Sequence, residues 1–377
     1  MTTALGKLAV LDFSRVLAGP LATMLLADLG ATVVKVERPG GGDDTRAWGP
    51  PYDDTGGATY FQSVNRNKES LVLDLTDAGD LVHARRLAGR SDVVVENFRP
   101  GLMDGLGLGY DALRADHPEL VYCSITGFGR GAGAALPGYD LLVQALGGLM
   151  SITGSPDGEP QKVGVALVDV LAGLFATVGI LAALRHRDAT GEGQRVEVDL
   201  LSALLAGLVN QGTAYTAGGV VPGRLGNSHP SIAPYELLPT AAGELVLAVG
   251  TDRQFGALCG VVGAPELADD PRFATNAERV RHREALREAL VLRLAARPAS
   301  TWVGLLTAAR VPAGLVNDVA GAFALATRIG LEPVVRLPRA DGTTVALTRN
   351  PIGLSATPPT YRSAPPALAA DEPQHGE

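Results

Sequence analysis

The chain has few of the residues that mark several classes of protein. Its 377 residues include two cysteines, Cys123 and Cys259, which lie far apart and match no metal or redox spacing. A disulfide framework is therefore not expected. We expect the protein to reside in a reducing compartment. The six histidines form no metal-ligand pattern either, so we expect no metal site.

Several catalytic and nucleotide-binding motifs are also absent. The sequence contains no Walker A loop, HExxH, CxxC or GxSxG motif. Gly105, Gly107 and Gly109 match two of the spacings of a dinucleotide-binding loop, but the last glycine of the GxGxxG pattern is absent. Hydride transfer with a nicotinamide cofactor is therefore disfavoured. The formal net charge of −8 argues against a nucleic-acid partner, but a few local cations can still hold a small anion.

Long hydrophobic runs are scarce. The first residues, MTTALGKLAVLDFSRV, indicate a short strand rather than a signal peptide. Segment 167–184 approaches the length of a spanning helix, but it contains Asp169 and two glycines. We expect this segment to be a buried helix of a soluble core, and the protein to be cytoplasmic with no membrane partner.

Short apolar runs alternate with helical patterns over the first half of the chain. The composition, 46% hydrophobic and 19% charged, is that of an ordinary globular protein. The runs expected to be strands are 8–13, 32–37, 70–75, 92–97 and 120–129. Strands that alternate with helices predict an α/β fold with a parallel, doubly wound sheet.

A change in composition divides the chain. Residues 217–234 are rich in Gly and Pro and predict a linker between a large domain, 1–216, and a smaller α+β domain, 235–325. In the smaller domain, 276–297 has the pattern of one charged helix. The final segment, 326–377, has extended stretches and proline pairs, and we expect it to pack back toward the large domain.

The stretch GVALVDVLAG, 164–173, places Asp169 among small and aliphatic residues. An ionised carboxylate in such surroundings is costly unless it is paired or has a chemical role. The local sequence leaves two compatible interpretations. Asp169 caps the following helix, or it is a reactive carboxylate held at the start of that helix.

Five cations follow predicted strands or lie in the loops just after them: Arg15, Arg38, Arg46, Lys68 and Arg99. Ligands of open parallel sheets bind beyond the carboxyl ends of the strands. The five therefore predict a site for a phosphate-bearing ligand, with scattered surface charge as the alternative.

Motifs along almost the whole chain resemble the class III CoA-transferases, also called the CaiB/BaiF or formyl-CoA and carnitine CoA-transferase family. The matching segments are 8–46, 65–75, 93–110, 122–129, 138–154, 190–206, 270–283 and 311–316. The resemblance implies a Rossmann-like large domain, a smaller second domain and an interlocked homodimer.

The resemblance also implies roles for individual residues. Asp169 occupies the position of the family's nucleophile, and acyl-CoA is a substrate rather than a covalently bound cofactor. The positions that match CoA contacts are Val16, Ala18, Arg38, Leu73, Thr76, Asn97, Phe98 and Tyr139. Separately from the resemblance, the glycine-rich composition at 145–148 makes the backbone amides of Gly147 and Gly148 candidates for stabilising an oxyanion.

The implied reaction transfers CoA from an acyl-CoA to a carboxylic acid through an aspartyl anhydride and an aspartyl-CoA thioester. One alternative is an acyl-CoA racemase or epimerase of the same fold. Those enzymes use a histidine in the segment occupied here by Gly138-Tyr139-Asp140, and a tyrosine with an ordinary pKa of ~10 is a poor substitute. A second alternative is a non-catalytic CoA-binding protein, which the retained Asp169 disfavours.

Three departures from the family pattern affect the expected specificity. Residues 224–235 replace the glycine run of formyl-CoA transferases and resemble the branch that handles succinyl-CoA and other dicarboxylic acids. Arg224, Ser228 and His229 are therefore candidates for holding a distal carboxylate. Gly105 stands where relatives often have a basic residue, so one CoA phosphate contact is expected to be missing. The C-terminus also lacks the family's usual Gly-Glu-His-Thr ending.

Overall fold

A computed structural model describes residues 3–369. The chain divides into two compact units. The first comprises the chain up to Leu149, Lys162–Val220 and the chain from Glu332 onward; the second comprises Met150–Gln161 and Val221–Leu331. Residues 150–161 thus belong to the second unit, whereas the predicted boundaries include them in 1–216. The predicted linker, 217–234, is divided between the units.

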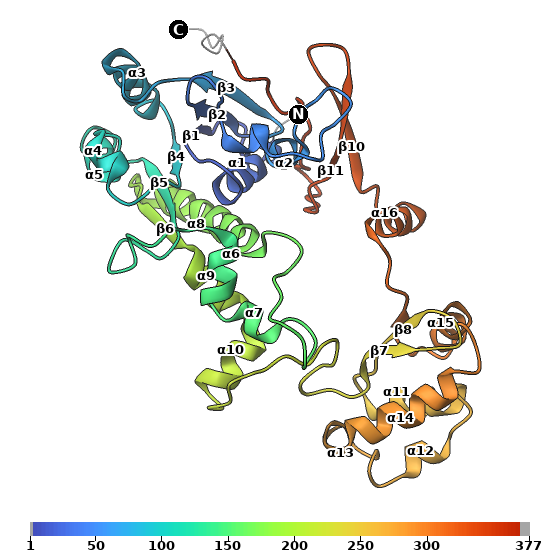
Figure 1. Cartoon of the computed structure of the whole chain (residues 1–377). Coiled ribbons are helices and arrows are strands. Elements are labelled where there is room, and N and C mark those ends of the chain that lie inside the picture. Colours follow the sequence, from blue (N-terminus) through green and yellow to red (C-terminus); the bar gives the residue numbers. More distant parts are fainter. Residues whose placement is uncertain (1–2, 370–377) are drawn as a thin grey trace. The chain divides into compact units, whose positions relative to one another are not determined.

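The first unit contains a six-stranded parallel sheet with strand order β3-β2-β1-β4-β5-β6 (Figure 1). The strands are β1 (Ala9–Asp12), β2 (Thr32–Glu37), β3 (Lys68–Val72), β4 (Val93–Glu96), β5 (Val121–Thr126) and β6 (Arg195–Asp199). The predicted α/β class with a parallel sheet is confirmed. The order is that of dinucleotide-binding sheets, and its direction reverses between β1 and β4, where such sheets bind ligands.

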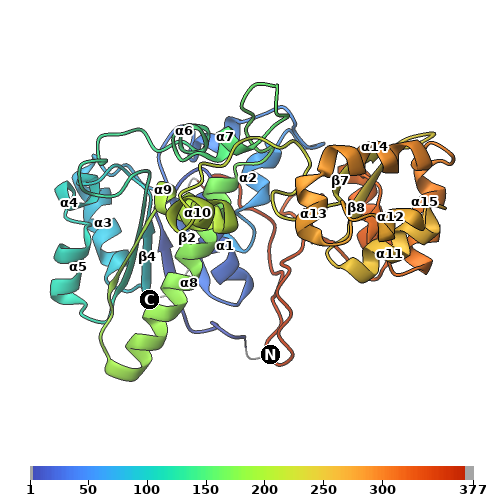
Figure 2. The same cartoon turned by 90° about the horizontal axis from the view of Figure 1, so that it is seen from below.

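Helices cover both faces of this sheet (Figure 2). One face carries α1 (Ala18–Asp28) and α8 (Leu167–Thr190), and the other carries α3 (Ala78–Ala88), α4 (Leu102–Gly105) and α5 (Tyr110–Asp116). In β4, Val93 and Val95 pack toward α1 and α8, while Val94 packs toward α3 and α5. Because both faces are covered, the central strands β1, β4 and β5 are near-continuous apolar runs, whereas the edge strands β3 and β6 include charged residues.

Shorter elements complete the first unit. They are the 3₁₀-helix η1 (Asp44–Ala47), α2 (Thr59–Ser63), α6 (Asp140–Leu146), α9 (Leu200–Gly207), α10 (Val209–Thr216) and the antiparallel hairpin of β10 (Val334–Pro338) and β11 (Thr344–Thr348). Helix α7 (Leu149–Ile152) crosses the boundary between the units. Helices α6 and α9 pack against α8, which places their residues near the first turn of that helix.

The segment after β11 packs on the first unit, as far as the described residues extend. The backbone N–H of Thr360 donates to the carbonyl of Asp28 at 2.7 Å, and the N–H of Asn67 donates to the carbonyl of Ser363 at 3.1 Å. Arg66 pairs with Asp28 at 2.6 Å. The last residues of the chain, where it departs from the family's usual ending, lie outside the described part.

The second unit combines a small antiparallel sheet with helices. Its strands are β7 (Tyr235–Pro239), β8 (Glu244–Ala248) and β9 (Ala313–Gly314), and its helices are α11 (Asp252–Val261), α12 (Glu266–Asp269), α13 (Asn276–Arg281), α14 (Arg283–Leu294), α15 (Ala299–Ala308) and α16 (Val319–Arg328). The prediction of one helix over 276–297 is wrong, because the chain breaks at His282. Buried Arg279 of α13 donates to the carbonyl of Ala233 at 2.8 Å, a tertiary contact that periodicity does not show.

Helix α8 is long and apolar enough to cross a membrane by length and composition alone. In the described structure it lies against the sheet, and 44% of its most apolar window is buried. The predicted burial therefore holds for one face only. The other face leaves Leu174, Phe175 and Val178 exposed.

Candidate active site

A cavity of about 410 Å³ lies beyond the carboxyl ends of β1, β4 and β5. Its lining residues all belong to the first unit. They include Arg15–Ala18 after β1, Asn97–Pro100 after β4, Thr126–Gly129 after β5, Leu136–Asp140 before and at the start of α6, and Asp169 of α8. This is the switch point of the sheet, the position at which open parallel sheets bind their ligands.

The loops after β1 and β4 are joined by one side chain. The N–H of Arg15 donates to Oδ1 of Asn97 at 2.8 Å, and Nδ2 of Asn97 donates to the carbonyl of Arg15 at 2.7 Å. The guanidinium of Arg15 lies 4.7 Å from the centre of the Phe98 ring. Asn97 thereby fixes the two loops to each other across the switch point.

Asp169 is the third residue of α8, and the prediction that it caps this helix is wrong. The N-cap is Ala166, which has no side chain able to cap. The capping oxygen comes from another helix: Oδ1 of Asp140 accepts from the N–H groups of Val168 at 2.8 Å and Asp169 at 3.4 Å. Because Asp140 serves the helix terminus, the carboxylate of Asp169 is left to face the cavity.

The surroundings of Asp169 disfavour its charge. Burial, and secondarily the negative charge of Asp140, raise the pKa of Asp169 to about 7. Burial and the carboxylates of Asp169, Asp140 and Asp43 raise the pKa of Tyr60 to about 12, so its hydroxyl stays protonated as a hydrogen-bond donor. A partly desolvated carboxylate beside a ligand cavity is the kind of group that acts in catalysis.

Two of these residues were not identified from the sequence. Asp140 precedes Val168 by 28 residues, and no spacing rule connects a cap to a helix so far along the chain. Tyr60 packs edge-on against Trp48, with ring centres 5.3 Å apart. The one local signal is the gathering of aromatic residues between positions 48 and 61 in a chain that is 5% aromatic.

The predicted CoA contacts fall into two groups. Five line the cavity together with Asp169: Val16, Ala18, Asn97, Phe98 and Tyr139. Arg38, Leu73 and Thr76 are outside the lining. Leu73 is buried in the core, Thr76 donates its hydroxyl to Asp74 at 2.7 Å, and Arg38 pairs with Asp44.

The predicted convergence of five cations on one ligand is wrong. Lys68 is completely buried and pairs with Asp12 at 3.1 Å, and burial lowers the pKa of Lys68 to about 8. Arg46 binds Glu37 at 2.7 Å. Arg15 and Arg99 remain in the cavity lining. Local sequence does not reveal that the fold supplies buried carboxylates for Lys68 and Arg46.

The two glycines suggested for an oxyanion site do not line the cavity. The N–H of Gly147 donates to the carbonyl of Val143 at 2.8 Å, as part of the end of α6. Within residues 3–369, no group of three or more His, Cys, Asp or Glu side chains is placed to hold a metal ion.

The candidates for a distal carboxylate site belong to the second unit. Arg224 donates from Nε to the carbonyl of Ser155 at 3.1 Å and from Nη2 to that of Gly158 at 2.8 Å. The ring of His229 packs on Tyr235, with centres 5.2 Å apart. The N–H of Ser228 donates to a neighbouring carbonyl within its own loop. Arg224 thus holds the loop at 155–158.

A carboxylate facing a cavity at the switch point of a parallel sheet is consistent with an acyl-transfer enzyme that acts on a nucleotide-bearing thioester. The family model described as CoA-transferase family III matches residues 5–372. The chain belongs to this family. It is an enzyme, a CoA-transferase that moves CoA from an acyl-CoA thioester to a carboxylic acid.

Individual relatives agree with this assignment. The chain is 44% identical to a succinate–glutarate CoA-transferase of Agrobacterium fabrum, over 98% of this chain and 94% of that protein. It is also 44% identical to an acetyl-CoA:oxalate CoA-transferase of Acetobacter aceti, over 84% and 81% of the two chains. The crystal structure of a CaiB/BaiF family protein from Brucella suis matches with a TM-score of 0.86 and 42% identity, covering 98% of this chain and 97% of that one.

Proposed function

We propose that Asp169 is the nucleophile of the transfer and that the substrates are succinyl-CoA or a similar donor and a short dicarboxylic acid. One observation carries the first part. Asp169 lines the cavity and has a pKa raised to about 7, while the side chain of Asp140 caps α8. The group is therefore basic enough to attack and is not tied to its own helix.

The reaction proceeds in four balanced steps. The Asp169 carboxylate attacks the thioester carbonyl, and CoA thiolate leaves, which forms a mixed anhydride. The thiolate attacks the aspartyl carbonyl and expels the donor acid, leaving an aspartyl-CoA thioester. The acceptor carboxylate attacks this thioester to form a second anhydride and release the thiolate. The thiolate then attacks the acceptor acyl carbonyl, which gives the new acyl-CoA and regenerates Asp169.

The surrounding residues support these steps. The N-terminus of α8 favours negative charge at Asp169 by ~0.3–1 kcal/mol or more when partly buried. Burial and the nearby carboxylates, Asp169 among them, keep the Tyr60 hydroxyl protonated. Each thioester broken is replaced by another, so no ATP is consumed.

The substrate proposal is supported by the names of the relatives, which include glutarate and oxalate as acids. Arg15 and Arg99 bring positive charge to the cavity for a CoA phosphate or a second carboxylate. Arg224, Ser228 and His229 stay candidates for the distal carboxylate. Arg224 would bind this carboxylate through guanidinium N–H groups other than those that donate to the carbonyls of Ser155 and Gly158.

Trapping tests the nucleophile. Incubation with succinyl-CoA followed by hydroxylamine is expected to convert Asp169 to a hydroxamate, detected by mass spectrometry of its peptide. Asp169→Ala is expected to lose the label and to slow transfer by about 10³-fold or more, because the covalent route is removed. Asp188→Ala, at the exposed far end of α8, serves as a matched control and keeps both. Wild-type transfer without a label at Asp169 contradicts the mechanism.

A panel of substrates tests the specificity. Succinyl-CoA with dicarboxylic acids of two to five carbons is expected to give kcat/KM values at least ~10-fold above those with monocarboxylic acids of equal length, since the cation that binds the second carboxylate loses its partner when that group is missing. Equal values for the two classes would refute the dicarboxylate proposal and leave the Asp169 proposal intact.

We further propose that the chain functions as a homodimer in the cytoplasm. The exposed apolar residues on α8 support a partner surface, and a second copy covers such a face without exposing new apolar area.

A further inference from the structure

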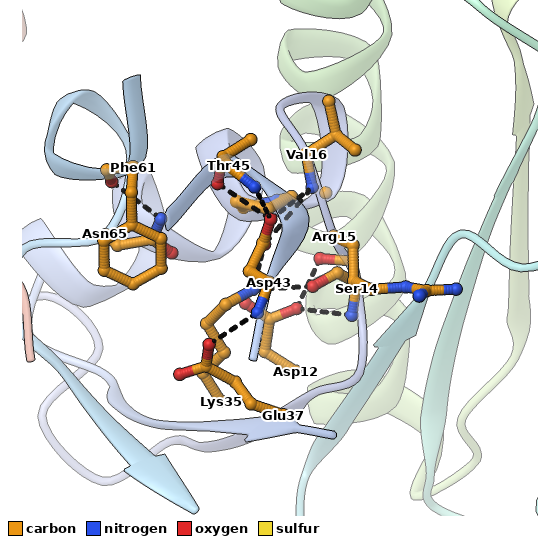
Figure 3. A network of polar contacts seen from close by, with 12 residues as sticks. Asp12, Ser14, Arg15, Val16, Lys35, Glu37, Asp43, Thr45, Phe61 and Asn65 are labelled. Atoms are coloured by element: carbon orange, nitrogen blue, oxygen red, sulfur yellow. Dashed lines mark hydrogen bonds and ion pairs between the residues drawn. The ribbon is translucent and has the colours of Figure 1, made fainter. Parts of the chain in front are cut away.

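Side chains from four segments of the chain hold the loop formed by residues 14–16, which follows β1 and enters the cavity. Figure 3 shows three of these side chains, Asp12, Lys35 and Asp43. Except for the carbonyl of Val16, each backbone N–H and carbonyl group of residues 14–16 forms a hydrogen bond with a side chain. These side chains lie on the preceding strand or far away in the sequence. The contacts are Ser14 N–H to Asp12 at 2.9 Å, Lys35 Nζ to the Ser14 carbonyl at 2.7 Å, the two Arg15 bonds to Asn97, and Val16 N–H to Asp43 Oδ2 at 3.2 Å.

The loop needs this support because Val16 is strained. Its φ of 70° lies in the left-handed region, which β-branched residues rarely adopt. Such a conformation costs ~1–3 kcal/mol and persists only when the surroundings determine it. The carboxylate of Asp43 supplies the hydrogen bond that fixes the Val16 peptide.

Asp43 is itself held by a completely buried ion pair. Its Oδ2 lies 2.9 Å from Nζ of Lys35, and both side chains are fully buried. Its Oδ1 accepts from the N–H and the hydroxyl of Thr45 at 3.0 and 2.7 Å. A buried pair is weak evidence for stability, since apolar residues of equal volume often stabilise as much. Its geometry is the more informative property: Lys35 and Asp43 each contact the loop directly.

The loop in turn sets the start of α1 against the helix that carries Asp169. After Val16, Leu17 and Ala18 line the cavity and begin α1. The carbonyl of Ala18 lies 2.7 Å from the position that a Cβ would occupy on Gly173. Gly173 is four residues after Asp169, on the same side of α8. A shift of the loop therefore changes the cavity wall next to Asp169.

We propose that the buried Lys35–Asp43 pair is a positioning device for CoA transfer: it holds the strained Val16 peptide so that Leu17 and Ala18 keep a fixed place beside the reacting acyl group on Asp169. This inference rests on the proposed role of Asp169. Val16 and Ala18 are also predicted CoA contacts, and the inference predicts a larger effect on the rate of the chemical step than on the binding of acyl-CoA.

The test uses Asp43→Asn, which keeps the shape of the side chain and removes its charge. We expect the rate of Asp169 acylation, and the steady-state kcat, to fall by ~10–100-fold, with the KM for acyl-CoA changed by less than ~3-fold, because small misplacements cost rate more than binding. Asp28→Asn is the matched control. It breaks the buried pair with Arg66, which does not touch the loop, and kcat is expected to stay within ~2-fold.

A second variant separates strain from general damage. Glycine adopts the left-handed conformation at little cost, so Val16→Gly combined with Asp43→Asn is expected to recover part of the lost rate. If Asp43→Asn does not fold, Thr45→Val removes one hydrogen bond to Asp43 and keeps both charges, and a ~3–10-fold lower kcat is expected.

Three results would overturn the positioning role: a wild-type kcat in the folded Asp43→Asn or Thr45→Val protein, an equal loss of kcat in Asp28→Asn, or a change in KM alone. Failure of the proposed nucleophile gives a different result. In that case the wild-type protein carries no label at Asp169, while the kcat values of the wild-type protein and the Asp43 variants can still be compared.

Discussion

Two carboxylates in one cavity, Asp140 and Asp169, have different surroundings because the fold gives them different partners. Asp140 accepts hydrogen bonds from the start of α8 and from Gln144 at 2.6 Å. The same fold buries Asp169 and places a negative neighbour beside it, which raises the pKa of Asp169 to about 7. Separate environments for two acids are a general way to assign one to structure and the other to chemistry.

The pH dependence of transfer follows from this shift. Attack requires ionised Asp169, so kcat/KM is expected to rise with pH through about 7, the pKa of that group. Asp140→Asn keeps a capping oxygen but removes the negative charge, so the midpoint is expected to move to lower pH. Burial is the larger cause of the shift, and the midpoint should stay above the ordinary value of an aspartate.

The measurement is a kcat/KM profile from pH 5 to about 9, with Asp188→Asn as the control. Asp188 lies on the same helix but at its far, exposed end, so its removal is expected to leave the midpoint in place. A midpoint that moves equally in both variants, or that rises in Asp140→Asn, contradicts the assignment.

Helices α1 and α8 meet at a glycine. A Cβ on Gly173 would lie 2.7 Å from the carbonyl of Ala18, a backbone atom that moves only with its helix. Gly173→Ala is therefore expected to lower the free energy of unfolding by ~1–3 kcal/mol and to lower kcat, because α1 is pushed from Asp169. Thermal or urea unfolding and the transfer assay measure the two effects.

The control is a glycine with no neighbour near its missing Cβ. Gly256 of α11 is such a position, with nothing within 4 Å. Gly256→Ala is expected to stabilise the protein by ~0.5–1 kcal/mol, since alanine loses less backbone entropy in a helix. If Gly173→Ala stabilises by a similar amount, close approach of the two helices is not what requires the glycine.

At the level of elements, the sequence was most informative where patterns are local. The runs at 32–37 and 92–97 became β2 and β4 almost residue for residue, because a strand buried on both faces needs a continuous apolar run. The short helices α4 and α7 were not predicted, since four residues contain too little periodicity. The break at His282 was also missed, because the contact of Arg279 with Ala233 joins distant parts of the chain.

At the scale of the whole molecule, apolar side chains are exposed on three successive helices that pack on one another, α8, α9 and α10. They include Leu174, Phe175 and Val178 of α8, Leu205 of α9, and Val209 and Tyr215 of α10. An exposed apolar patch of this kind is typical of an interaction surface, which supports the proposed homodimer.

A charged substitution in the patch tests that proposal. Val178→Asp, combined with Phe175→Asp, is expected to convert the dimer to a monomer, measured by sedimentation equilibrium, because two charges would be buried without partners. Val82→Asp is the control: Val82 is 63% exposed on α3, on the other face of the sheet. A wild-type protein that sediments as a monomer, or a dimer that survives the double substitution, contradicts this interface.

The sequence by itself determined the α/β class and the parallel sheet, since periodicity is a local property. It singled out Asp169 as an isolated charge in an apolar run, and the family resemblance predicted its role as nucleophile. Five of the residues matched through the family resemblance line the cavity. Only the tertiary structure decided that Asp140 caps α8, that Lys68 and Arg46 neutralise internal carboxylates, and that Asp43 holds Val16. Those roles depend on distances and burial between segments far apart in the chain, which exist only once it has folded.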